Sequence, residues 1–305
     1  MFGECHMHLF MNGTNYKKAV ELHKNGVQDE DIRQKFAVYQ QSGISFLRDG
    51  GDVLGVSERG MELAPEYGIT YRTPVFAIHK KGHYGGIVGR GFDNMQEYYA
   101  LVQEVRRRGG HFIKIMISGI MDFAKEGEVS EPPVSEEEIR EMIHIAHEEG
   151  FSVMAHANGA RTVQCAVEAG LDSVEHGNFV DEECLLAMKE SQVIWVPTFV
   201  TIANLIGNGR FDDDGLMRLR KRQGDTIRRG FELGVRIALG SDAGAFCVPH
   251  SQGLYNEYEW MQRLTGLVPS LDNRVAGNWT ETPLLTQREL DQRLSEAEKV
   301  IRIRF

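Results

Sequence analysis

Residues 135–177 read SEEEIREMIHIAHEEGFSVMAHANGARTVQCAVEAGLDSVEHG. Amphipathic helical patterns and short apolar runs alternate in this stretch, at residues 135–149, 152–157, 159–170 and 172–176. Ser135 and Glu138 have the S-x-x-E spacing of a capping box, and Gly150 and Gly170 follow the helical patterns where a left-handed cap residue is needed. The pattern predicts helices that alternate with strands of a parallel sheet.

The same alternation continues in both directions along the chain. The apolar runs fall near residues 3–9, 44–48, 70–78, 111–118, 152–157, 172–176, 193–199 and 236–242. Further helical patterns fall near residues 30–42, 55–67, 93–108, 181–191, 213–234 and 252–265. Since no linker interrupts these eight units, residues 1–267 are predicted to form an α/β fold, a (β/α)8 TIM barrel. Residues 268–305 are predicted to be a C-terminal extension whose terminal helix, near 287–299, packs on the barrel or at an oligomer contact.

Composition limits the class of protein and of partner. The 305 residues are 42% hydrophobic and 26% charged, which is ordinary globular usage and disfavours disorder. With 34 Lys+Arg against 44 Asp+Glu the net charge is −10, so neither a nucleic acid nor an anionic membrane is an expected partner. No apolar run approaches a membrane span, and the first residues lack a basic signal-peptide region. A cytoplasmic protein with a small-molecule substrate is expected, and homo-oligomers are left open.

The first predicted strand carries two histidines two residues apart. In the sequence CHMHL at residues 5–9, the period of two places His6 and His8 on one face of the strand. We expect this face to point into the barrel, whereas Cys5 and the other apolar residues are expected to face the helices. Two imidazoles on one face of a strand can hold a metal ion together.

Four more polar residues fall inside or at the ends of other strands. Lys114 lies between two isoleucines that suit the helix-packed face, so its charge is predicted to lie inside, where it needs a partner or a modification. His156, His176 and Asp242 end the fifth, sixth and eighth strands. Imidazoles and a carboxylate bind Zn²⁺, although iron, manganese and cobalt accept the same ligands. A buried salt bridge of Lys114, with Asp242 for example, and a Schiff-base lysine are the alternatives.

This arrangement resembles the amidohydrolase superfamily over about residues 1–250. Barrels of that superfamily carry HxH on strand one, Lys on strand four, His on strands five and six and Asp on strand eight. The sequences FIKIM at 112–116 and SVEHG at 173–177 look most like the prolidase and imidazolonepropionase-like branch. The resemblance implies two divalent metal ions, with zinc the first expectation, and a carbamate on Lys114 that bridges them. The implied ligands are His6, His8 and Asp242 for one ion, and His156 and His176 for the other.

The reaction implied by the resemblance is metal-dependent hydrolysis of an amide or cyclic amide C–N bond, dipeptides included. A hydroxide would attack the carbonyl carbon, Asp242 would take the proton and pass it to the leaving nitrogen, and His83 would donate to the oxyanion. The same site would serve lactone, ester or phosphotriester hydrolysis. A metal-free Schiff-base lyase and a non-catalytic binding barrel are the readings from other classes, but neither needs four imidazoles.

The sequence departs from its relatives in three places. Five residues precede His6, so we expect no β-sandwich domain beside the barrel. Residues 197–202 read PTFVTI, without the Tyr that often follows strand seven in prolidase-like relatives, which argues against a true dipeptidase. Residues 156–159 read HANG and lack the Glu of the HxxE pattern in deaminases, which argues against deamination.

Loop residues give predictions about the substrate. Arg48, at the end of the second strand, is predicted either to bind a substrate carboxylate or to pair with a neighbouring Asp. Tyr84, Arg210 and His250 follow strands three, seven and eight, and we expect them to contact the substrate. Basic residues on these loops indicate an anionic substrate.

Overall fold

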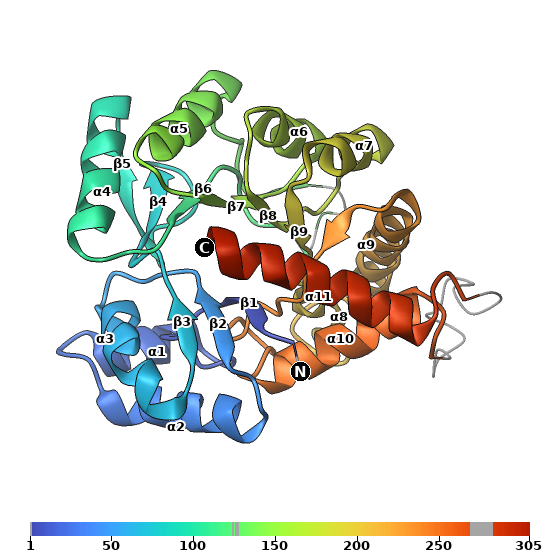
Figure 1. Ribbon diagram of the computed structural model, residues 1–305, viewed down its shortest axis with the longest axis horizontal. Helices are drawn as coiled ribbons and strands as arrows, with labels where there is room; N and C mark the ends of the chain where they lie inside the picture. The colour runs from blue at the N-terminus through green and yellow to red at the C-terminus, as the bar shows by residue number, and fades with distance from the viewer. Residues whose placement is uncertain (1, 124, 126–127, 269–282) are drawn as a thin grey trace.

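Parallel strands form the centre of the molecule, and helices surround them (Figure 1). The computed structural model describes residues 2–123, 125, 128–268 and 283–305. Within these residues one sheet contains, in order, β1 (Glu4–Met7), β2 (Phe46–Asp49) and β3 (Thr70–Arg72). The other contains, in order, β10 (Arg236–Ile237), β9 (Ile194–Val196), β8 (Ser173–His176), β7 (Val153–Ala157), β6 (Ile113–Met116), β4 (Ala77–Lys80) and β5 (Gly89–Phe92). Neighbouring strands are parallel throughout, which confirms the predicted α/β class.

Helices alternate with the strands in the predicted places, and two short helices, at residues 16–23 and 200–203, were not predicted. They are α1 (Tyr16–His23), α2 (Asp29–Gln41), α3 (Val56–Leu63), the 3-10 helix η1 (Ala64–Tyr67), α4 (Met95–Arg107), α5 (Glu136–Glu148), α6 (Ala160–Glu168), α7 (Glu182–Ser191), α8 (Val200–Ala203), α9 (Asp213–Leu233), α10 (Gln252–Leu264) and α11 (Gln287–Arg304). Ser135 Oγ accepts a hydrogen bond of 3.3 Å from the Glu138 amide, as its capping motif predicts. Gly234 ends α9 with a φ of +83°, a left-handed conformation that glycine adopts without strain.

The third predicted strand, at residues 70–78, is divided in two. Pro74 has no N–H to donate to a sheet, and Val75 has a φ of +68°, so the chain turns between β3 and β4. As a result β3 pairs with β2, whereas β4 pairs with β6. On the other side, the Cys5 amide donates to Leu239 O (3.0 Å) and the His8 amide donates to Ala243 O (2.8 Å). These bonds place β1 beside the chain that follows β10.

Strand β5 was not predicted from the sequence, because glycine is depleted in strands. Gly89 pairs with Ala77 of β4, and a Cβ atom at Gly89 would lie 2.3 Å from the Ala77 carbonyl oxygen. The close approach of the two backbones therefore requires glycine at this position.

Helix α11 covers the end of the sheets where the strands begin, and Figure 1 shows it crossing the middle of the molecule. Its residues Ala297 and Ile301, together with Phe305, pack in a buried cluster with residues from the starts of several strands, namely Phe46, Phe112, Met154 and Ile194. The helix is longer than predicted, and it begins with a full capping box formed by Thr286 and Glu289. The predicted domain boundary at residue 268 adjoins residues 269–282, which lie outside the described part, so the division stays a prediction.

Cys5 differs from its expected orientation. It packs in the same cluster as Phe112 and Ile301, beneath α11 at the starts of the strands, and not against the helices that follow the strands. The pairing of β1 with β2 shifts in register between Glu4 and Met7, which breaks the strict alternation on which the expectation depended.

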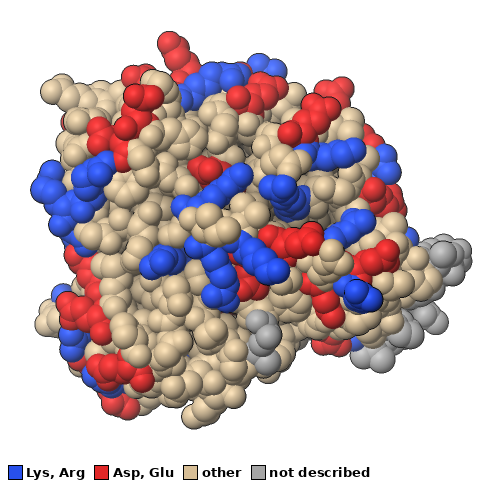
Figure 2. All heavy atoms as spheres, in the orientation of Figure 1, with Lys and Arg blue, Asp and Glu red and all other residues tan. Residues whose placement is uncertain are grey.

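Charged side chains of both signs lie on the face that α11 crosses (Figure 2). Figure 2 shows Lys and Arg side chains interspersed with Asp and Glu over the face that α11 crosses. All four cysteines are free. Among the described residues, every helix is too short or too polar to pass through a lipid bilayer.

Candidate metal centre

The six predicted metal ligands lie together at the end of the sheets opposite α11. His6 is on β1, Lys114 on β6 and His156 on β7, whereas His176 ends β8. All six line one cavity of about 720 Å³, namely His6, His8, Lys114, His156, His176 and Asp242. The carboxyl ends of parallel strands bring together residues that are up to 236 positions apart, as the barrel prediction requires.

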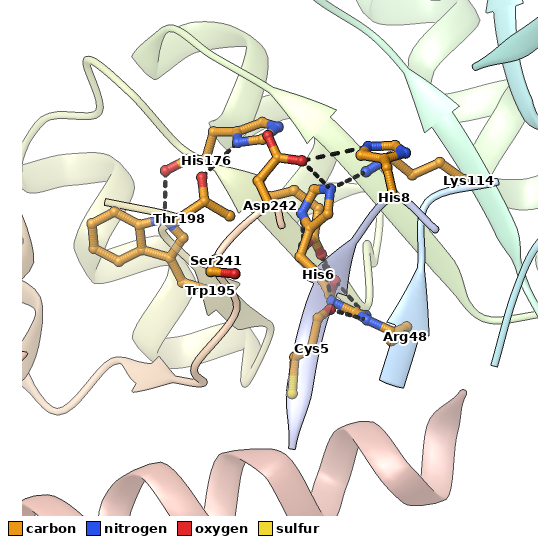
Figure 3. A network of polar contacts seen from close by, with 12 residues as sticks. Cys5, His6, His8, Arg48, Lys114, His176, Trp195, Thr198, Ser241 and Asp242 are labelled. Atoms are coloured by element: carbon orange, nitrogen blue, oxygen red, sulfur yellow. Dashed lines mark hydrogen bonds and ion pairs between the residues drawn. The ribbon is translucent and has the colours of Figure 1, made fainter. Parts of the chain in front are cut away.

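Three of these side chains form a compact group that fits a divalent ion (Figure 3). Asp242 Oδ1 lies 3.7 Å from His6 Nε2 and 3.5 Å from His8 Nε2, and one ligand atom from each side chain lies within 4.8 Å of the others. Asp242 Oδ1 is buried and has no hydrogen-bond partner among the described residues. A buried carboxylate oxygen facing two imidazoles is stabilised by a bound cation, so the donor set fits a metal such as zinc.

The other two histidines lie directly beside this group. The ring centroid of His176 is 5.1 Å from that of His6 and 4.6 Å from that of His156. His176 Nδ1 lies 2.7 Å from the hydroxyl of Thr198, and His156 Nε2 lies 3.1 Å from the Gly119 carbonyl oxygen. Each ring therefore has one nitrogen held by the protein, which fixes its orientation in the cavity.

Lys114 lies inside the sheets, as its position between two isoleucines predicts, and is 1% exposed. Its Nζ is 3.4 Å from His6 Nε2. Burial lowers the pKa of Lys114 to about 8, although the carboxylates of Glu175 and Asp242 act in the opposite direction. Within the described part of the chain, no carboxylate forms an ion pair with Lys114, so the salt bridge considered with Asp242 is not seen.

Burial also determines the charge of the imidazoles. It lowers the pKa of His6, His8 and His176, and lowers that of His156 to about 3. All four are therefore neutral near pH 7, which is the form that binds metals. Burial raises the pKa of Asp242, against the attraction of His8 and Lys114.

The backbone is strained at the same place. Asp242, His176 and Thr198 have φ values of +61°, +67° and +48°. Non-glycine residues in this conformation cost about 1–3 kcal/mol each and cluster at functional sites. Hydrogen bonds hold two of them in place, because the Asp242 amide donates to His6 O (2.7 Å) and Trp195 Nε1 donates to His176 O (2.9 Å).

Arg48 does not line the cavity, although it was a candidate for binding a substrate carboxylate. It is 0% exposed and donates to Glu175 Oε1 (2.8 Å) and Cys5 O (2.6 Å). The alternative, pairing with an acidic residue, is therefore correct in kind, but the partner is Glu175 and not a neighbouring Asp. Glu175 had no role in the sequence analysis; the available signal was an acidic residue inside an apolar strand, where a charge needs a partner.

The loop candidates divide into two groups. Tyr84 and Arg210 line the cavity, and the Tyr84 ring lies 5.1 Å from the ring of His156. His83, one residue away, is not among the lining residues. Neither is His250, whose two ring nitrogens contact the Tyr39 hydroxyl (3.1 Å) and Met11 O (2.8 Å).

The cavity wall is largely apolar and has cationic side chains at its edge. The apolar lining residues include Met11, Ile87, Met116, Ile120, Leu205 and Phe246. Lys17 and Arg210 also line the cavity and are exposed, and the Arg210 guanidinium lies 4.8 Å from the ring centroid of Phe246. Such a cavity can hold an apolar group together with an anionic one.

Comparisons with known proteins show which family this chain resembles in sequence. The family model described as "Amidohydrolase family" matches residues 5–286. Ochratoxinase of Aspergillus niger is 29% identical over 155 residues, which are 49% of this chain and 32% of that protein. An uncharacterized protein of Mycobacterium tuberculosis is 26% identical over 266 residues, which are 85% of this chain and 66% of that protein. The chain thus spans about a third and about two thirds of the length of these two relatives.

Two solved structures illustrate the likeness of fold. A Xaa-Pro dipeptidase with methionine bound in its active site has a TM-score of 0.74 and 23% identity, covering 99% of this chain and 75% of that one. Ochratoxinase of Aspergillus niger has a TM-score of 0.67 and 21% identity, covering 85% of this chain and 66% of that one.

Proposed function

The chain belongs to the amidohydrolase family, and from this premise we propose that it is a metal-dependent hydrolase that cleaves an amide or cyclic amide C–N bond in a small substrate. The observation that carries the proposal is the presence of four imidazoles, a lysine and a carboxylate around one cavity. Membership of the family, and the similarity to ochratoxinase and to a Xaa-Pro dipeptidase, support C–N bonds as the target.

The proposed cofactors are two divalent ions, with zinc the first expectation. His6, His8 and Asp242 would hold one ion, and His156 and His176 the other, with a carbamate on Lys114 shared by both. Ions bound in this way polarise a carbonyl group and lower the pKa of water to about 7. The carbamate requires a neutral amine, and the burial of Lys114 favours that form.

We propose that one side chain transfers a proton and that another donates a hydrogen bond during the reaction. Asp242 would accept a proton from the attacking water and deliver it to the leaving nitrogen, because the residue lines the cavity and its Oδ1 has no hydrogen-bond partner among the residues that the structure describes. A residue of the loop after β4 would donate to the oxyanion. His83 is the candidate from the sequence, and Tyr84 is the neighbour that lines the cavity. Burial raises the pKa of Tyr84, so its hydroxyl keeps the proton needed to donate.

The finer architecture is also part of the proposal. We propose that the strands close into a (β/α)8 barrel, with β3 and β4 as two halves of its third strand. The hydrogen bonds of Cys5 and His8 to Leu239 and Ala243 support closure on one side. The pairing of β3 with β2 and of β4 with β6 supports it on the other.

The proposed substrate carries a carboxylate and an apolar group. Lys17 and Arg210 would hold the carboxylate at the edge of the cavity, while the apolar wall takes the other group. Ester, lactone or phosphotriester hydrolysis at the same site is the second candidate, because the metal ligands alone do not select the bond. A cytoplasmic location stays a prediction.

The first test is metal content by elemental analysis of protein purified without chelator and with bicarbonate. About two divalent ions per chain, loss of activity on chelation and its return with Zn²⁺ are expected. N-acyl amino acids, dipeptides, cyclic amides and lactones would then be compared as substrates. Absence of bound metal after reconstitution would overturn the proposal, and a preference for lactones over every amide would favour the second candidate.

A further inference from the structure

A series of buried polar contacts leads from His6 away from the cavity. His6 Nδ1 lies 2.8 Å from Glu175 Oε2, and Arg48 Nη2 donates to Glu175 Oε1 at 2.8 Å. His6, Glu175 and Arg48 are each 0% exposed. Ser173 accepts from Arg48 Nη1 at 2.9 Å and itself donates to Glu175. The Glu175 carboxylate thus contacts an imidazole on one side and a guanidinium on the other.

This series of contacts ends at Phe305, the residue that follows α11. The Arg48 guanidinium carbon lies 4.5 Å from the ring centroid of Phe305, which is close enough for a cation–π interaction. The Phe305 ring is itself held by Phe112, at 5.2 Å between centroids in an edge-on arrangement. Figure 3 shows Arg48 and Cys5 between His6 and the helix that crosses the lower part of the view.

The geometry has a consequence for the ring of His6. A carboxylate beside Nδ1 favours the tautomer with a proton on that nitrogen and leaves the lone pair on Nε2. His6 Nε2 is the atom that faces Asp242, at 3.7 Å. A carboxylate this deeply buried needs a fixed cation, which Arg48 supplies, and Arg48 in turn needs its other donors occupied.

We propose that Glu175 is a positioning residue that orients His6 for metal binding, and that Arg48 and the Phe305 ring hold Glu175 in place from the opposite end of the sheets. This inference rests on the proposed metal-binding function. According to this inference, the contact between Phe305 and Arg48 raises the affinity of the His6 site for metal. Neither Phe305 nor Arg48 lines the cavity.

The test measures Zn²⁺ affinity of metal-free protein by competition with a chelator, in bicarbonate, alongside thermal unfolding of the metal-free state. Glu175→Gln keeps the shape of the side chain and removes its charge, and it should weaken Zn²⁺ binding by about 10–100-fold, as loss of such outer contacts does. Phe305→Leu should weaken binding by a smaller factor. Phe92→Leu is the matched control, because Phe92 is also fully buried and packs edge-on against another ring, that of Tyr98, but it contacts neither Phe305 nor Arg48; it should lower the unfolding temperature without lowering affinity.

Glu175→Gln leaves the Arg48 charge buried without its anion, so this variant can be lost to misfolding. The double variant Glu175→Gln/Arg48→Met removes both charges. It tests the positioning role of Glu175 in a protein that has no unpaired buried ion at this place. It should fold and still bind Zn²⁺ more weakly than the wild type.

The outcomes separate the two proposals. Wild-type affinity in both Glu175 variants would overturn the positioning role and leave the hydrolase proposal intact. Equal affinities for Phe305→Leu and Phe92→Leu would remove Phe305 from the inference. Failure of the wild type itself to bind Zn²⁺ would overturn the proposed function, and the positioning role with it.

Discussion

The hydroxyl oxygen of Thr198 lies 2.7 Å from Nδ1 of His176, and both residues have left-handed backbone conformations. The contact occupies one ring nitrogen and leaves the other toward the cavity. It also joins the loop after β9 to the last residue of β8, so two segments with strained backbones hold each other in place.

Thr198→Val removes this contact while keeping the size and branching of the side chain. We expect a loss of about 10-fold or more in Zn²⁺ affinity, because the His176 ring is no longer held in one orientation. Chelator competition on the metal-free protein measures it. Thr265→Val is the matched control, since within the described part of the chain the Thr265 hydroxyl donates to the Met261 and Gln262 carbonyl oxygens of α10 and to no residue of the cavity. Equal affinities of the two variants would contradict the role of Thr198.

Lys114→Ala should lower the number of bound divalent ions and abolish turnover, because the proposed carbamate is lost. Elemental analysis with and without bicarbonate measures the first effect. Lys80→Ala is the control, since Lys80 pairs with Glu138 and does not line the cavity. An unchanged metal content in Lys114→Ala would remove the carbamate from the proposal.

Asp242→Asn should retain metal and lose activity by about 10²–10⁴-fold, the usual contribution of a general base. Asparagine tolerates the positive φ of residue 242, so the fold is expected to persist. Steady-state kinetics beside elemental analysis distinguish the two effects. Activity near that of the wild type would mean that another group accepts the proton.

The loop after β4 offers two candidate donors to the oxyanion, and single variants distinguish them. Tyr84→Phe removes only a hydroxyl from the cavity wall, whereas His83→Asn changes a side chain outside it. If Tyr84 is the donor, Tyr84→Phe should lower kcat by about 10²-fold with little change in KM, and His83→Asn should be nearly neutral. The reverse result would favour His83 and would imply that this loop moves when substrate binds.

Acid should destabilise the metal-free protein through its buried imidazoles. Burial lowers the pKa of His250 from 6.5 to about 3, so below pH 6.5 the unfolded chain binds a proton that the folded chain does not. Stability is therefore lost as the pH falls from about 6.5 toward 3, and His250 alone should account for about 2 kcal/mol between pH 7 and pH 5.

Denaturant unfolding at these two pH values tests the effect of His250. His250→Gln should lose about 2 kcal/mol less than the wild type on the same change of pH. An identical loss in both proteins would show that His250 takes up its proton in the folded state as readily as in the unfolded chain.

The alternation of the strands was enough to predict which side chains meet in the cavity. His6 and His8 share a face, and Lys114 lies between two outward isoleucines, so each orientation follows from a period of two within one strand. The ends of parallel strands then bring His156, His176 and Asp242 to the same place. These predictions depend on the alternation of side chains within a strand and on the rule that the carboxyl ends of parallel strands meet at one end of the sheet.

Other features depend on contacts between distant parts of the chain. Glu175 and Arg48 are 127 positions apart, and nothing near either residue identifies the other as its partner. The division of residues 70–78 at Pro74 and Val75 reflects the pairing of β3 with β2 and of β4 with β6. The orientation of Cys5 depends on a shift of register with the neighbouring strand. Pairing across the fold, rather than local propensity, decides these cases.

The packing of α11 against the starts of the strands has a consequence for turnover. In the part of the chain that the structure describes, Ala297, Ile301 and Phe305 fill that end together with Phe46, Phe112 and Met154. The cavity that the six proposed metal ligands line lies at the opposite end. If the proposed hydrolysis takes place there, both fragments of a cleaved substrate would leave through the end at which the next molecule enters. Product release and substrate binding would then compete with each other.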